Sequence, residues 1–156
     1  KWPVGVGAKG NDGVTGLVKS TPGAVGYVEL AFASQNKLAV AALVNHAGAK
    51  VKPSVETIAA AAASAEVPAD YRVSITDAPG AGSYPISGFT YLLIHKDSAD
   101  DQKGKALLNF LWWAMHEGQK VAPGLDYAPL PTSLQKRVEA MLRTLTVNGK
   151  APLASR

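Results

Sequence analysis

The chain contains no cysteine among its 156 residues, so disulfide bonds and thiolate metal sites are excluded. Long apolar runs are lacking as well, because the longest, LAVAALV and IAAAAASA, fall far short of a bilayer-spanning length. An initiator methionine, a charged leader and a cleavage motif are also absent, and we therefore expect any secretion signal to have been removed. The remaining composition, 47% hydrophobic and 18% charged, is typical of a globular domain.

The chain carries a modest positive charge, with a formal net charge of +4 and an isoelectric point near 9.3. Nucleic-acid-binding proteins usually gather such charge on one face with aromatic residues between. Here the lysines are spread out, which predicts a solvated surface and no nucleic-acid partner, although a positive surface still favours the approach of small anions. The spread is seen at Lys9, Lys19, Lys37, Lys50, Lys52, Lys96, Lys103 and Lys105.

No motif indicates catalysis or metal binding. The three histidines are far apart, and none lies in a metal-ligand spacing such as H-E-x-x-H. Ser83 and Ser87 lack the G-x-S-x-G context of a nucleophile elbow. Carboxylates can still converge in space, although the sequence shows no acid/base pair among Asp12, Glu29, Asp77 and Asp126. We therefore expect a protein that is not an enzyme, with no catalytic residue, metal or cofactor.

The first 30 residues predict a glycine-rich loop, a short helix, a turn and a strand. The glycines of residues 5–10 permit sharp bends, and either Asn11 or Asp12 can cap the helix that follows. That helix ends at the STPG turn, where proline lacks an amide proton and glycine tolerates a positive φ. A strand is expected over residues 24–30, in which Gly26 leaves room for close backbone approach.

A glycine-rich loop ahead of a helix also suggests a phosphate-binding loop, because helix N-terminal amides favour anions. The P-loop pattern G-x-x-x-x-G-K-[ST] is absent, however. Residues 5–10 match G-x-G-x-x-G in letters only, since no strand precedes them in this chain. The spacing therefore favours a structural turn over a nucleotide site.

Four blocks follow one another along the chain: KWPVGVGAKGNDGV, STPGAVGYVEL, YPISGFTYLLIHK and LDYAPLP. In this order they closely resemble the phosphate-binding protein of the bacterial phosphate ABC transporter, over residues 1 to about 148. The resemblance implies an α/β fold of the type II periplasmic binding protein kind, with two lobes joined by a hinge. It also implies that inorganic phosphate binds between the lobes and is delivered to a membrane permease, in the periplasm or another extracytoplasmic space. This chain would then be the C-terminal half of the full protein.

One part of the family pattern is absent from this chain. The family's anion-gripping segment, Arg-x-Asp-Gly-Ser-Gly-Thr, precedes the Lys-Trp-Pro and has no counterpart here. The resemblance thus implies that the phosphate contacts lie upstream of Lys1, in a missing N-terminal part of the same protein. Within this chain, Asn11 and Asp12 remain as candidates. Two alternatives stay open: a structural fragment without ligand binding of its own, and a binder of another oxyanion.

The loop over residues 77–83 is the best internal boundary, because it is rich in glycine and is followed by an aromatic and β-branched run. The resemblance places residues 1–83 in the second lobe and residues 84–156 in a return segment that belongs to the first lobe. The other half of the first lobe is not in this sequence. We therefore expect the isolated chain to expose apolar surface and to associate.

Local patterns predict the other elements. Strands are expected over 38–45, 72–76 and 88–95, helices over 31–36, 55–65, 103–118 and 132–147, a hairpin-type turn over 46–50 and a loose tail over 150–156. The last helix begins at a TSLQ capping box. The helix over 103–118 has an apolar stripe made of Leu107, Phe110, Leu111, Ala114 and Met115. Of the adjacent Trp112 and Trp113, we expect at least one to pack in the core or against a lobe.

Overall fold

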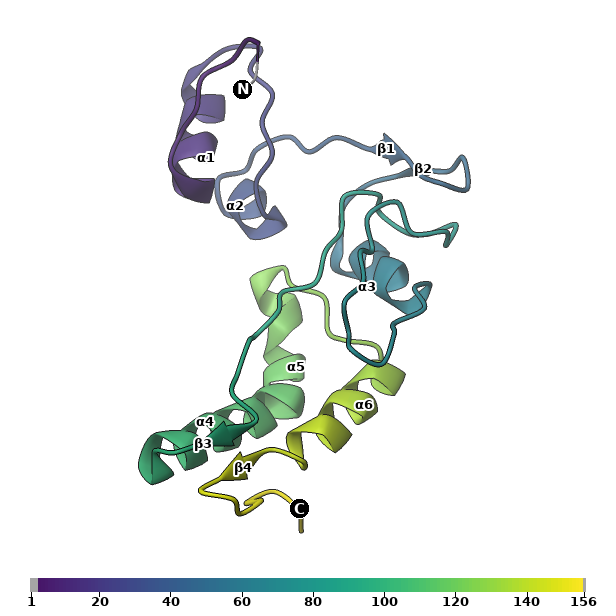
Figure 1. Cartoon of the computed structure of the whole chain (residues 1–156). Coiled ribbons are helices and arrows are strands. Elements are labelled where there is room, and N and C mark those ends of the chain that lie inside the picture. Colours follow the sequence, from purple (N-terminus) through teal and green to yellow (C-terminus); the bar gives the residue numbers. More distant parts are fainter. Residues whose placement is uncertain (1–2, 156) are drawn as a thin grey trace.

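The computed structural model describes residues 3–155, whose elements form three groups along the molecule (Figure 1). Two helices lie at one end, a hairpin and a helix lie in the middle, and a helical unit with a small parallel sheet lies at the other end. In chain order the elements are α1 (Gly10–Ser20), α2 (Leu30–Gln35), β1 (Leu43–Val44), β2 (Lys50–Val51), α3 (Val55–Ala63), β3 (Asp97–Ser98), α4 (Asp101–Met115), α5 (Glu117–Val121), η1 (Ala122–Leu125), α6 (Thr132–Leu142) and β4 (Thr146–Val147).

Helices α1 and α2 pack on each other and form the first group, which we call the α1–α2 unit (residues 3–36). The close approach expected at Gly26 is confirmed, because a Cβ there would lie only 2.7 Å from Val18 Cγ2 and 2.9 Å from Val14 Cγ1. The strand expected over residues 24–30 is wrong: this segment crosses α1 as irregular backbone without a partner strand, and α2 begins already at Leu30. The short helix expected over 31–36 is confirmed as α2.

The middle group begins with an antiparallel hairpin in which Leu43 pairs with Val51. The turn expected over 46–50 is confirmed, since Asn45 N donates to Ala49 O and Gly48 adopts a φ of 78°. The strand expected over 38–45 shrinks to the two residues of β1, because β2 offers only two partner residues.

Helix α3 begins where the sequence predicts. Ser54 Oγ accepts from Thr57 N at 3.2 Å, and Thr57 Oγ1 accepts from Ser54 N at 2.9 Å, which makes a reciprocal cap. The alanines of α3 pack closely on Ile75 and Ala78, and together they form a small core. Residues 72–76 contribute to this core as irregular backbone, and the strand expected there is wrong because no partner strand lies beside it.

Asn45 ties the hairpin to the loop over 77–83. Its buried side-chain amide donates to Ala81 O at 2.8 Å and to Ser83 O at 3.1 Å, while its Oδ1 accepts from Ala49 N at 2.9 Å. A buried amide with these partners fixes the loop, because each carbonyl would otherwise lie unsatisfied.

The third group is the helical unit, residues 94–153, which holds the larger core. Strands β3 and β4 pair in parallel, with Asp97 opposite Thr146, and so join the beginning of the unit to its end. Gly104 of α4 packs directly on this pair, because a Cβ there would lie 2.8 Å from Ser98 Cβ and from Val147 Cγ2. The core residues come from α4, α6, β4 and the C-terminal segment: Leu108, Leu111, Leu142, Leu145, Val147 and Leu153.

A carboxylate closes the turn after β4. Asp97 Oδ1 accepts from Thr146 Oγ1 at 2.5 Å and from Gly149 N at 3.0 Å. The hydrogen bond from Thr146 and then that from Gly149 stabilise the charged form, and they hold the pKa of Asp97 below its ordinary value of 3.8.

Several helix limits differ from the prediction. Helix α4 begins at Asp101, capped by Asp100, and the helical path breaks at His116 and continues as α5 through Gly118. Helix α6 ends at Leu142, before the expected limit. The TSLQ capping box does not form, because Gln135 Nε2 donates to Leu130 O at 2.7 Å instead. The prediction of a loose tail is also wrong for Leu153, because its side chain is buried in the core with only 1% of its surface exposed.

Helix α4 is apolar on two faces. The buried residues of its inner face are Gly104, Leu108 and Leu111, of which only Leu111 belongs to the predicted stripe. Two members of that stripe, Leu107 and Phe110, instead lie at the surface with Trp113, and we call these three residues the outer face of α4. Phe110 and Trp113 stack at 5.9 Å between ring centroids. Trp112 packs against the core, which confirms the expectation for one tryptophan.

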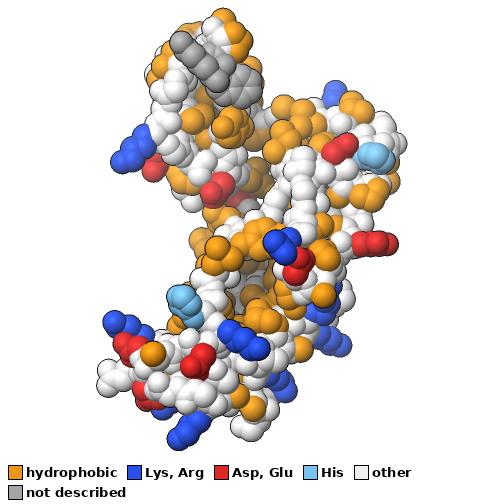
Figure 2. Space-filling model, viewed as in Figure 1, with side chains coloured by type: hydrophobic (Ala, Val, Ile, Leu, Met, Phe, Trp, Pro, Cys, Tyr) orange, Lys and Arg blue, Asp and Glu red, His pale blue; other side chains and the backbone are white. Residues whose placement is uncertain are grey.

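The segment over 88–95 has no strand partner among the described residues, so the strand expected there is wrong. Leu93, at 96% exposed, and Leu92 project from it into solvent. The accessible surface of 10,561 Å² compares with about 7,500 Å² for a compact monomer of this mass. Figure 2 shows hydrophobic side chains along much of the visible face. The expected exposure of apolar surface is thus confirmed, while association remains a prediction.

Candidate functional site

Asn11, a candidate from the sequence, does not cap α1. The N-cap residue is Lys9, and no side chain caps that end, so the expected cap by Asn11 or Asp12 is wrong. Asn11 lies in the first turn of α1, where its Nδ2 donates to Glu29 Oε1 at 3.1 Å and its Oδ1 accepts from Glu29 N at 3.2 Å. Its side chain is therefore engaged within the α1–α2 unit, which leaves it poorly placed to hold an anion.

Asp12, the second candidate, is an exposed carboxylate in the first turn of α1. A negative charge there complements the helix dipole and repels a phosphate. The glycine-rich loop before it bends sharply, with φ values of 105° at Gly5 and 62° at Gly10. The geometry favours the structural turn over the phosphate-binding loop.

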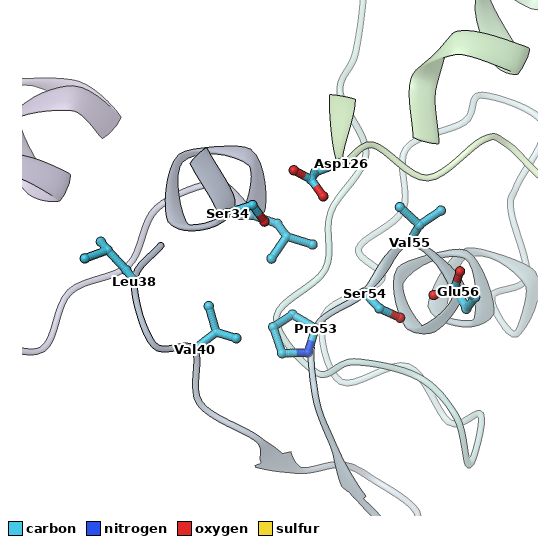
Figure 3. Close-up of a pocket in the computed structure, with 9 residues that line it drawn as sticks. Ser34, Leu38, Val40, Pro53, Ser54, Val55, Glu56 and Asp126 are labelled. Carbon is cyan, nitrogen blue, oxygen red and sulfur yellow. The ribbon is translucent and has the colours of Figure 1, made fainter. Parts of the chain in front are cut away.

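A cleft of about 350 Å³ lies between α2 and the beginning of α3 (Figure 3). Its lining is mainly apolar with two serines, and the charged groups on it are two carboxylates, Glu56 and Asp126. The hydrogen bond from Ser54 lowers the pKa of Glu56, which is therefore ionised at neutral pH. No lysine or arginine is among the described lining residues. The carboxylates of this cleft would therefore repel a phosphate, and no cationic side chain on the lining can donate a charge-assisted hydrogen bond to it.

A second cleft, of about 200 Å³, lies between α3 and α6 and is lined by one cation, Arg137. The Arg137 guanidinium already donates to Val67 O and to Pro68 O, at 2.7 Å each. It also lies 5.1 Å from the centroid of the Tyr71 ring, and Tyr71 Oη donates to Arg137 O at 2.9 Å. The arginine therefore joins two segments of the chain.

The histidines and carboxylates noted in the sequence do not gather into one cluster. His46 Nδ1 lies 3.5 Å from Asp77 Oδ2 at the surface, and His116 Nε2 lies 3.3 Å from Glu139 Oε1. Among residues 3–155 no three His, Asp or Glu side chains are grouped so as to hold a metal ion. Over the same residues, no helix combines the length and the apolar character needed to cross a membrane.

The structure does bring together one polar cluster that the sequence did not indicate. Glu29 Oε1 accepts from Asn11, and Glu29 Oε2 accepts from the phenol of Tyr127, a residue 98 positions away. The hydrogen bond to Glu29 is the main cause of a raised pKa of the Tyr127 phenol. No sequence signal pairs these residues, since both belong to segments whose local pattern predicts only extended backbone.

Comparison with known protein families identifies the superfamily of this chain. A model described as a PBP superfamily domain matches residues 1–116, which is well over half of the chain. The chain belongs to the PBP superfamily. The α/β fold class expected from the sequence is thereby confirmed for this superfamily member.

Several curated relatives of this PBP-superfamily chain carry the same name. The Phosphate-binding protein PstS of Xylella fastidiosa (strain Temecula1) is 46% identical over 142 residues, covering 90% of this chain and 39% of the relative. Proteins of the same name from Pasteurella multocida (40% identical; 92% and 42% covered) and Methanocaldococcus jannaschii (43% identical; 86% and 39% covered) are also similar. The chain thus spans about two fifths of the length of these relatives, and the resemblance seen in the four sequence blocks is confirmed.

Proposed function

We propose that this chain is the C-terminal part of a phosphate-binding protein that serves an ABC importer. In this role the protein captures inorganic phosphate between two lobes outside the cytoplasm and delivers it to a membrane permease. The observation that carries the proposal is the similarity to proteins named PstS, at 40 to 46% identity over about nine tenths of this chain. Since these relatives are named as binding proteins, we infer binding without chemical conversion of the ligand.

The anion site itself is proposed to lie mainly in the part of the protein that precedes Lys1. A desolvated phosphate needs several charge-assisted donors, and arginine is the most efficient supplier. The arginines that the structure describes have other partners: Arg72 pairs with Asp70, Arg137 with backbone carbonyls, and Arg143 with the ring of Trp112. Both clefts therefore lack available cationic donors, which supports a site completed by other residues.

The division into lobes is likewise a proposal: residues 1–83 belong to the second lobe, and residues 84–156 return to the first. Two apolar surfaces support it, namely the unpartnered segment over 88–95 and the outer face of α4. A helix that is apolar on both sides is normally buried on both sides. We infer that the remainder of the first lobe covers these surfaces and pairs with the segment over 88–95.

The test is isothermal titration of phosphate into the 156-residue chain and into the full-length protein, with sulfate as the second ligand. We expect micromolar or tighter binding of phosphate by the full-length protein and none by the isolated chain. Tight binding by the isolated chain would contradict the proposed location of the donors. Binding of sulfate but not phosphate by the full-length protein would favour the second candidate, a receptor for another oxyanion.

A further inference from the structure

The α1–α2 unit is connected to the rest of the molecule by few contacts. Its two helices pack on each other (Figure 1), and a cleft separates α2 from the beginning of α3 (Figure 3). Among residues 3–155, Lys37 N and Leu38 N donate to Ser34 O and Ala33 O where the chain leaves α2, and one long-range hydrogen bond, donated by Tyr127 Oη to Glu29 Oε2, joins the unit to a distant segment. Apart from the chain that continues after residue 36, the bond between Tyr127 and Glu29 is therefore the long-range polar contact of this unit among the described residues.

Glu29 is held in place for this contact from within its own unit. It is the residue immediately before α2, and its Oε1 accepts from Asn11 Nδ2 at 3.1 Å while its backbone N donates to Asn11 Oδ1 at 3.2 Å. The two bonds form a ring that fixes both the backbone and the carboxylate of Glu29. The second oxygen is thereby directed away from α1, toward Tyr127.

Tyr127 is positioned on the other side by a tight turn. Asp126 adopts a left-handed conformation with a φ of 62°, and Tyr127 N donates to Ala122 O at 3.1 Å. Because η1 and α5 pack together, the phenol extends from the helical unit rather than from a free loop. The contact thus joins two preorganised groups, and neither side must be ordered to form it.

A second connection along the chain is much more extensive. Three hydrogen bonds join residues 67–71 to α6: Tyr71 Oη donates to Arg137 O, and the Arg137 guanidinium donates to the carbonyls of residues 67 and 68. The same guanidinium makes a cation–π contact with the Tyr71 ring. Tyr91 adds another tie, because its phenol donates to Tyr71 O and Val73 O at 3.0 and 2.9 Å. Several bonds in one place resist separation, whereas a single exposed bond opens readily.

We propose that Tyr127 and Glu29 form a releasable latch between the two lobes, while the Tyr71–Arg137 cluster remains joined. In the proposed division Glu29 lies in the second lobe and Tyr127 in the first, so the bond forms only when the α1–α2 unit lies against the helical unit. The latch therefore favours the closed arrangement. Its assignment to two lobes and its coupling to phosphate rest on the proposed function, but the latch between the α1–α2 unit and the helical unit does not.

The latch is tested by a distance measurement in the full-length protein. The chain has no cysteine, so Lys19→Cys and Lys136→Cys, both at exposed positions, supply a pair of spin labels on the α1–α2 unit and on α6. Any cysteine in the rest of the protein is first replaced. Pulsed electron spin resonance then gives the distance distribution without phosphate, in the parent and in Tyr127→Phe, which removes only the hydroxyl.

We expect the ratio of latched to unlatched molecules to fall about fivefold in Tyr127→Phe, which corresponds to about 1 kcal/mol at 25 °C. The matched control is Tyr27→Phe, because Tyr27 is 80% exposed and lies outside the cluster. Glu29→Ala should reproduce the effect, and the double variant should be no worse than either single one, because both remove the same bond. Unchanged distributions in Tyr127→Phe and Glu29→Ala would overturn the latch.

Titration of the same variants with phosphate separates this inference from the proposed function. If the latch favours the closed form, Tyr127→Phe raises the Kd for phosphate by up to about fivefold, mainly through faster dissociation. A lowered or unchanged Kd in a variant with an altered distance distribution would overturn the assignment to the closed form. If the parent protein binds no phosphate, the proposed function fails, and the distances measured without ligand still decide the latch.

Discussion

Phe110 lies on the outer face of α4, and the loss of stability caused by Phe110→Ala should depend on whether the rest of the protein is present. Phe110 is 57% exposed in this chain, so roughly half of its side chain has already left water. Complete burial of such a side chain is worth about 1.5 to 3 kcal/mol. In the isolated chain, Phe110→Ala should therefore lower the free energy of unfolding by only about 1 kcal/mol. In the full-length protein, where we expect this face to be covered, the same change should cost about 3 kcal/mol or more.

Urea denaturation of both proteins measures this difference. The matched control is Leu111→Ala, because Leu111 lies one residue along the same helix but is 6% exposed within the inner core. It should cost about 2 to 5 kcal/mol in both proteins. Fluorescence of a hydrophobic dye is a second measurement and should be weaker in the full-length protein than in the isolated chain. An equal cost of Phe110→Ala in the two proteins would refute the idea that the remainder covers α4.

Three further substitutions test the fold. Gly26→Ala should lower the melting temperature, because its methyl group would overlap two valines of α1 and cost about 1 to 3 kcal/mol, whereas Gly16→Ala, with open space around it, should be neutral or stabilising. Asn45→Ala should cost about 1 to 3 kcal/mol in urea denaturation, since the loop carbonyls lose their buried donor. The lowered pKa of Asp97 means that its contribution to stability is complete above pH 3.8 and is lost as the pH falls through the lowered value, so Asp97→Asn should flatten the acid limb of a stability-versus-pH curve.

Helices were predictable from the sequence because their signals are local. The reciprocal cap of α3 and the turn that ends α1 are set by residues within a few positions of each other. Strands were not, because a strand needs a partner that can be far away. The segment over 88–95 has the composition of a strand and stays unpaired here, since none of the described segments forms a ladder with its backbone.

The interior of the helical unit and the candidate site also depend on contacts that local sequence patterns do not specify. Helix α4 is apolar on two faces, so its periodicity alone could not decide between Phe110 and Leu108 as the inward residue. Asn11 was predicted as a helix cap and as a candidate contact for phosphate; it does not cap α1, and its hydrogen-bond partner in the structure is Glu29. The bond between Glu29 and Tyr127 depends on the three-dimensional path of 98 residues, which no short-range pattern encodes.

The parallel pairing of β3 with β4 has a consequence for how the chain acquires its structure. The larger core draws all its members from residues 94–153, and it includes Leu153 near the end of that range. During synthesis this unit cannot be completed until its final strand and Leu153 have left the ribosome, although α4 emerges about 40 residues earlier. Until then the inner face of α4 lacks its packing partners from α6, β4 and the C-terminal segment, so this helix is the segment for which a chaperone would compete during translation.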